Sequence, residues 1–196
     1  MINMKQMPLG AYQTNCYLVW GEDSPTCVVI DPGYEPERVL SEVARLNKTI
    51  EAVLLTHGHF DHVGAVKEIH AATGCKVYLH TADLVLPEKL TAGPLFYTHS
   101  YGEGDTLNLA GLTIDVIHTP GHTPGSVCLL MGNEMFSGDT LFACSFGRTD
   151  LPGGDPRKMM ESLRRLASLQ GNFFIHPGHG GSTTLDAEKR FNPYMH

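Results

Sequence analysis

The chain has 196 residues, of which 42% are hydrophobic and 18% are charged, and its formal net charge is −7 at pH 7. These values are typical of a globular protein, and the length predicts one domain, residues 1–196, with a sizeable core. The acidic balance, without a lysine- or arginine-rich segment, argues against nucleic acid as a partner, because neutralising phosphates supplies most of the affinity for nucleic acids.

Neither export nor membrane insertion is expected. No apolar segment approaches the ~20 residues that cross a bilayer, and the N-terminus lacks the apolar core of a signal peptide. The five cysteines are scattered and include no Cys-x-x-Cys pair, which suits free thiols in a reducing compartment. We therefore predict a cytoplasmic protein with no membrane partner, either a monomer or a small homo-oligomer.

Apolar patterns along the chain predict strands interspersed with helices. In chain order, the expected elements are strands at 16–20 and 27–30, a helix at 36–46, a strand at 52–55, a helix at 63–72, strands at 77–79 and 112–117, a hairpin at 127–136, a helix beginning at 156 and a strand at 173–175. Residues 87–103 fit no element, and we interpret them as a packed loop rather than an aromatic lid. The order predicts an α+β domain in which two layered sheets are covered by helices.

A histidine-rich turn follows one of the predicted strands. The string H-G-H-F-D-H at 57–62 leaves the strand so that His57 and His59 can face one metal, while Asp61 and His62 face a second. A helix that begins near Asp61 would also favour a carboxylate in its first turn. The alternative is a surface histidine cluster with no functional metal.

Three further turns supply ligands of the same kind. Each follows a predicted strand and places a glycine directly before His122, Asp139 or His179. Glycine at such positions lets the backbone approach a shared centre closely. With the first motif, these turns place five imidazoles and two carboxylates at strand ends. That donor set suits zinc and also iron or manganese.

The seven side chains divide into two groups that share Asp139 as a bridge. The groups are His57, His59 and His122 for one metal, and Asp61, His62 and His179 for the other. The first group leaves an open position, as a catalytic zinc site does. Two metals ~3.5–4 Å apart can share a hydroxide and polarise an electrophile. We therefore expect two divalent ions per chain, zinc foremost, with Asp61 and Asp139 as candidate catalytic carboxylates.

These residues, in this order and spacing, resemble the metallo-β-lactamase superfamily, and the likeness runs from about residue 10 to 190. The resemblance implies a four-layer αβ/βα sandwich with the metals at one edge of the two sheets. The strings at 118–126 and 137–142 are similar to the glyoxalase II-like branch, and the string at 147–154 to its short, single-domain members. The glutathione-using enzymes of that branch carry a basic, helical C-terminal region, which this sequence lacks, so glutathione specificity is not expected.

The resemblance implies a metal-dependent hydrolase, and we predict that a metal-bridging hydroxide hydrolyses a small thioester of the hydroxyacyl-thiol type. Arg148 is a candidate for holding a substrate carboxylate or, equally, for a salt bridge that fixes its loop. The same branch includes persulfide dioxygenases, in which His57, His122 and Asp139 would bind a single Fe(II).

Other functions are ranked lower. A lactonase shares the full ligand set and stays a further alternative. A β-lactamase of this superfamily would normally be exported and lack the bridging Asp139. A non-catalytic metal-binding module is disfavoured, because structural zinc sites are closed and usually rich in cysteine.

Overall fold

The computed structural model describes residues 1–195, and its layers follow from the alternation of side chains along the strands. In β2 (Thr14–Gly21), Cys16 and Leu18 pack into one hydrophobic cluster, whereas Tyr17 and Val19 pack into another. Successive side chains of a strand point to opposite faces. A strand that is apolar on both faces is therefore an inner strand, covered on each side by another layer.

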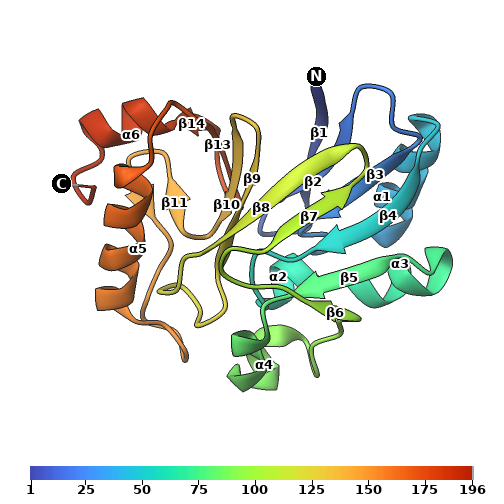
Figure 1. Cartoon of the computed structure of the whole chain (residues 1–196). Helices are drawn as coiled ribbons and strands as arrows, with labels where there is room; N and C mark the ends of the chain where they lie inside the picture. Colours follow the sequence, from blue (N-terminus) through green and yellow to red (C-terminus); the bar gives the residue numbers. More distant parts are fainter. Residues whose placement is uncertain (196) are drawn as a thin grey trace.

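Over residues 1–195, the strands form two mixed six-stranded sheets that pack face to face (Figure 1). The first sheet has the order β1 (Ile2–Leu9), β2, β3 (Thr26–Ile30), β4 (Thr49–Leu54), β5 (Lys76–Leu79) and β6 (His99–Ser100). The second has the order β14 (Thr183–Thr184), β13 (Phe174–Pro177), β10 (Glu134–Gly138), β9 (Val127–Met131), β8 (Leu112–His118) and β7 (Thr106–Leu109). A short hairpin joins β11 (Leu141–Phe142) to β12 (Ser145–Phe146).

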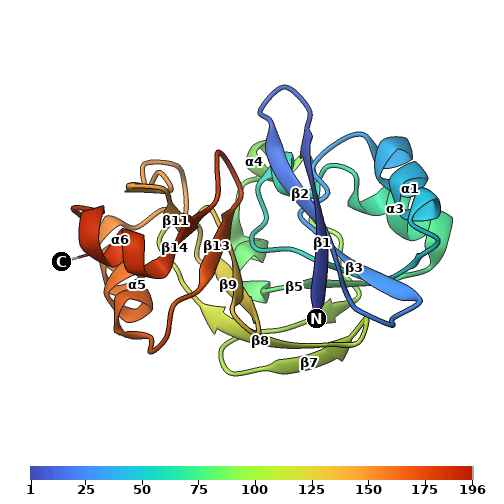
Figure 2. The same ribbon diagram turned by 90° about the horizontal axis from the view of Figure 1, so that it is seen from above.

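Helices cover the outer face of each sheet. The longer helices are α1 (Pro36–Arg45) and α3 (Val66–Thr73) on the first sheet, and α5 (Pro156–Ser168) and α6 (Leu185–Phe191) on the second. Figure 2 shows the two helical layers on opposite sides of the paired sheets. This is the predicted α+β fold, a four-layer αβ/βα sandwich. The longest helix, α5, has 13 residues, and no helix within residues 1–195 has the length and apolar character needed to cross a bilayer.

The predicted helix at 63–72 is divided in two. A single turn, α2 (Phe60–Val63), precedes α3, and Gly64 lies close to Gly33, where a Cβ would be 2.3 Å from the Gly33 carbonyl oxygen. The remaining predicted helices and strands are present with ends shifted by a few residues. The strands β1, β6, β7, β11, β12 and β14 and the helices α4 (Glu88–Thr91) and α6 were not predicted.

Residues 87–103 are fixed to the body of the protein at a few positions, although more than half of them are exposed. They contain α4 (Glu88–Thr91) and β6, preceded by the 3₁₀ turn η1 (Thr81–Val85). Phe96 packs against the first hydrophobic cluster, and the buried Tyr101 donates a hydrogen bond to the Leu55 carbonyl at 2.7 Å. The packed-loop interpretation stays a prediction. Among residues 87–103, Leu90 alone lines the cleft described below.

Candidate metal centre

The residues predicted to bind metal all follow strand ends at one edge of the two sheets. By element, His57 and His59 follow β4, Asp61 and His62 lie in α2, His122 follows β8, Asp139 follows β10, and His179 follows β13. The short α2 places a carboxylate in its first turn, as the sequence predicted. Both sheets therefore contribute ligands to one place.

The seven side chains meet as the two predicted groups. In the first ligand group (His57, His59 and His122) the potential ligand atoms all lie within 4.8 Å of one another. The second ligand group is Asp61, His62 and His179, and it meets the same limit. Within it, Asp61 Oδ2 is 3.2 Å from His179 Nε2 and 3.6 Å from His62 Nε2.

Asp139 lies between the two groups. Its Oδ1 is 3.5 Å from His62 Nε2, and its Oδ2 is 3.5 Å from His122 Nε2 and 3.6 Å from His179 Nε2. Two ligands of one tetrahedral metal, each bonded at about 2.1 Å, lie roughly 3.4 Å apart. These separations are therefore those of ligands around shared cations. Asp139 Oδ2 lies near both groups, and Asp139 Oδ1 lies near the second.

Several buried polar atoms have no protein partner among the described residues. They are His57 Nε2, His59 Nε2, His62 Nε2 and Asp139 Oδ1. Buried polar atoms in native proteins nearly always have a hydrogen-bond partner or bind an ion. Cations held by the two groups would satisfy His57, His62 and Asp139, so the residues fit a pair of divalent metals.

Burial and neighbouring charges set the protonation of these groups. Burial lowers the pKa of His57, and it lowers the pKa of His59 to about 4, so both are neutral, which is the form that binds metal. Burial would also lower the pKa of His62, but the carboxylates of Asp139 and Asp31 outweigh it and raise that pKa to about 9. His62 therefore lies in the most negative part of the centre.

A carboxylate that was not predicted orients His62. Asp31, which follows β3, is buried, and its Oδ2 is 2.9 Å from His62 Nδ1. Thr56 donates to the same carboxylate from its backbone N–H at 2.8 Å and from its hydroxyl at 2.6 Å. Such a partner on the far ring nitrogen turns the other nitrogen towards a metal. No role was predicted for Asp31, although its place directly after the predicted strand at 27–30 was the available signal.

A second carboxylate, Asp83 of η1, was also missed. It is fully buried and accepts hydrogen bonds from the Gly58 N–H at 2.7 Å, the Gly125 N–H at 2.6 Å and the Thr123 hydroxyl at 3.0 Å. Burial raises the pKa of Asp83, against the effect of these hydrogen bonds. Asp83 thereby joins the loop between His57 and His59 to the loop that follows His122, and it is a positioning residue for the first ligand group.

Two glycines allow the backbone to crowd Asp139. A Cβ at Gly178 would be 2.3 Å from Asp139 Oδ1, and a Cβ at Gly147 would be 1.8 Å from the Asp139 carbonyl oxygen. Neither distance is possible for a real side chain. The glycine before His179 thus does what the sequence suggested, since it brings that turn against the shared carboxylate.

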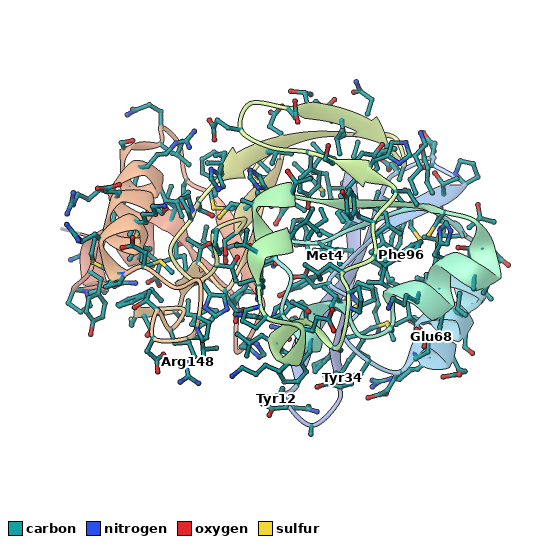
Figure 3. The ribbon with its side chains drawn as sticks, turned by 90° about the horizontal axis from the view of Figure 1, so that it is seen from below. Met4, Tyr12, Tyr34, Glu68, Phe96 and Arg148 are labelled. Carbon is teal, nitrogen blue, oxygen red and sulfur yellow. The ribbon has the colours of Figure 1, made fainter. Side chains whose placement is uncertain are left out.

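A cleft with a volume of about 450 Å³ opens over both ligand groups. Its floor consists of His59, Asp61, His122, Asp139 and His179, and its walls consist of Tyr12, Phe60, Leu90, Phe142, Arg148 and Leu151. Tyr12 and Arg148 project along one edge of the molecule in Figure 3. The side chains that could bind metal are therefore open to a small molecule.

Arg148 makes a salt bridge. Its Nε and one terminal nitrogen each donate to an oxygen of Asp150 at 2.7 Å. Its backbone carbonyl lies 2.7 Å from His122 Nδ1 and so orients that imidazole. The structure shows this salt bridge, and the binding of a substrate carboxylate by Arg148 stays a prediction.

The sequence matches the family model of the metallo-β-lactamase superfamily over residues 9–179. The chain belongs to this superfamily. It is 35% identical to the hydroxyacylglutathione hydrolase GloC of Haemophilus influenzae, with 99% of this chain and 98% of that protein covered. The chain therefore combines membership of a metallo-hydrolase superfamily with a cluster of histidine and aspartate side chains that can bind metal.

Solved structures extend the likeness. The B3 metallo-β-lactamase BLEG-1 is 37% identical with a TM-score of 0.89, and 98% of this chain and 99% of that chain are covered. The protein TTHA1623, solved in a di-iron-bound form, is 42% identical with a TM-score of 0.86, over 97% of this chain and 99% of that chain. These metallo-β-lactamase-fold structures match nearly the whole of the chain, including the edge that carries the ligands.

Proposed function

We propose that the chain is a thioester hydrolase acting on small acyl thioesters of the hydroxyacyl-thiol type. The observation that carries the proposal is the position of Asp139 between the two ligand groups, which gives both groups a common carboxylate under one cleft. Similarity over nearly the full length to a protein named hydroxyacylglutathione hydrolase supports it. Bound in these groups, divalent ions would supply a hydroxide near neutral pH and polarise the substrate carbonyl.

The chain's own residues would orient the reaction. Asp61 stays ionised, since the hydrogen bond from His179 outweighs burial and lowers its pKa. Thr14 donates to Asp61 Oδ2 at 3.1 Å and fixes that carboxylate at the cleft floor. Asp61 is thus an ionised hydrogen-bond acceptor at the cleft floor, and together with Asp139 it would orient an incoming water molecule. The leaving group needs little help, because a thiol with an ordinary pKa of about 8.5 departs readily as a thiolate.

Zinc is the metal we propose, with iron as the alternative. Imidazole and carboxylate donors suit zinc, iron and manganese alike. The di-iron-bound form of TTHA1623 supports iron. The two metals predict different chemistry, because hydrolysis needs no redox change, whereas the dioxygenase alternative requires Fe(II) and oxygen.

The test is a pair of assays on protein loaded with one metal at a time. Zinc-loaded protein should release free thiol from S-lactoylglutathione or a simpler acyl thioester without oxygen, at a rate that hardly depends on the glutathione part. Iron-loaded protein should show no oxygen uptake with glutathione persulfide. Oxygen uptake by the iron form, with no thiol release by the zinc form from any thioester, would replace the hydrolase with the dioxygenase.

Hydrolysis of a β-lactam is the second candidate, favoured by the likeness to BLEG-1, a B3 metallo-β-lactamase. Adding a chromogenic cephalosporin and a simple lactone to the thioester panel ranks the three classes of carbonyl substrate. We expect the thioester to be cleaved with the highest kcat/KM. A higher value for the cephalosporin would make β-lactam hydrolysis the principal activity.

A further inference from the structure

The walls of the cleft are mainly apolar. Tyr12 and Phe60 pack edge to face with ring centroids 5.3 Å apart and make one wall, and Leu90, Phe142 and Leu151 also line the cleft. Such a surface holds hydrocarbon and disfavours charge, because a charged group loses its water there without gaining a partner.

Arg148 is the only lysine or arginine among the described residues that line the cleft. Its guanidinium group already binds both oxygens of Asp150. The hydrogen bond from Arg148 lowers the pKa of Asp150 to about 2, so Asp150 carries its negative charge across the physiological pH range. A substrate carboxylate would therefore have to displace Asp150 or lie beside its negative charge.

We propose that the cleft holds the acyl arm of the thioester and selects acyl arms that end in an uncharged, apolar group, and that Asp150 excludes acyl arms that end in a carboxylate by occupying Arg148. The proposal rests on the thioester function and names its substrate class. Asp150 is thus a specificity-determining residue that need not touch the preferred substrate. Arg148 would be a latent carboxylate site, which removal of the Asp150 charge exposes.

The test measures binding, so that it does not depend on turnover. Two non-hydrolysable thioethers of N-acetylcysteamine serve as probes: the S-hexyl compound and the S-(5-carboxypentyl) compound, which carry chains of equal length that differ in a terminal carboxylate. Calorimetry on the metal-loaded wild-type protein should show at least about tenfold tighter binding of the S-hexyl compound. Asp150→Asn should reduce this preference about tenfold by improving binding of the carboxylate compound, since a freed guanidinium binds carboxylate in a bidentate manner.

The control is a matched salt bridge outside the cleft. Arg45 donates to both oxygens of Glu42 at 2.9 and 2.7 Å on α1, so Glu42→Gln removes the same kind of pair and should leave the preference unchanged. Leu90→Gln should weaken binding of the S-hexyl compound about fivefold to tenfold, and it tests the apolar wall even if Asp150→Asn fails to fold.

Equal binding of the two probes by the wild-type protein, or binding of neither, would overturn the inference. So would an unchanged preference in folded Asp150→Asn. Failure of the thioesterase function has a different signature: the S-hexyl preference and the effect of Asp150→Asn persist, but no S-hexanoyl thioester releases thiol.

Discussion

Removal of the Asp83 carboxylate tests whether a buried acceptor fixes the first ligand group. Asp83→Ala leaves the Gly58 N–H and the Gly125 N–H buried without an acceptor, and the Thr123 hydroxyl loses one of its two partners but keeps Ser126 Oγ at 2.8 Å. Each unsatisfied group costs about 1–3 kcal/mol, and relief from burying a carboxylate offsets part of the sum. We expect a net loss of about 3–5 kcal/mol, which is a large share of the roughly 5–15 kcal/mol that stabilises a typical domain.

The replacement Asp83→Asn refines this expectation. The amide keeps the size of the side chain and can still accept from Gly58 and Thr123, but its NH₂ group would face the Gly125 N–H. It should therefore cost less, about 1–3 kcal/mol. Both variants should also bind metal less tightly in the first ligand group, because Gly58 stands between two of its histidines.

The assays are thermal unfolding by circular dichroism and metal content by elemental analysis. For a chain of this length, each kcal/mol lowers the unfolding midpoint by roughly 2–4 °C, so Asp83→Ala should lie about 10 °C below the wild type. Asp23→Ala replaces an exposed aspartate and should be nearly silent. If both Asp83 variants unfold within about 2 °C of that control with full metal content, Asp83 does not hold the loops as argued.

Three further expectations concern the metal centre and the core. Asp139→Ala should lower metal content in both ligand groups, and His179→Ala should lower it mainly in the second. His99→Ala, which replaces an exposed histidine, is the control. Unchanged metal content in Asp139→Ala would contradict the bridging position of Asp139. Asp31→Asn should weaken metal binding in the second group by about 10- to 100-fold in a chelator competition, and an unaltered affinity would remove Asp31 from the centre. Leu163 is fully buried in α5, so Leu163→Ala should lower the free energy of unfolding by about 2–5 kcal/mol in a urea titration. A loss below about 1 kcal/mol would mean that the outer helix layer is loosely packed.

The ligand turns could be predicted because their signals are local. Each consists of an apolar strand followed within a few residues by glycine and a histidine or aspartate, and the structure brings His57, His122, Asp139 and His179 together as expected. A strand with apolar residues on both faces also predicts an inner layer. Local patterns were therefore sufficient for two layered sheets covered by helices and for the meeting of these four side chains.

The supporting carboxylates depend on contacts between distant segments. Asp83 meets Gly58 and Thr123 across 25 and 40 positions, and nothing in the neighbouring sequence distinguishes it from a surface aspartate. The strand β1 was missed because its exposed Lys5 and Gln6 interrupt the apolar alternation at the edge of the sheet. The helix α6 has only 7 residues, too few for a helical period to be recognised.

Both ligand groups combine residues from an early and a late part of the chain. Each takes two members from the turn at 57–62 and its third from a later segment, His122 in one case and His179 in the other. Neither sheet alone completes either group. A ribosome releases the N-terminal part first. Until position 179 has emerged and the second sheet has closed on the first, the nascent chain holds at most part of its metal complement, so the hydrolytic centre comes into being as one of the last events of folding.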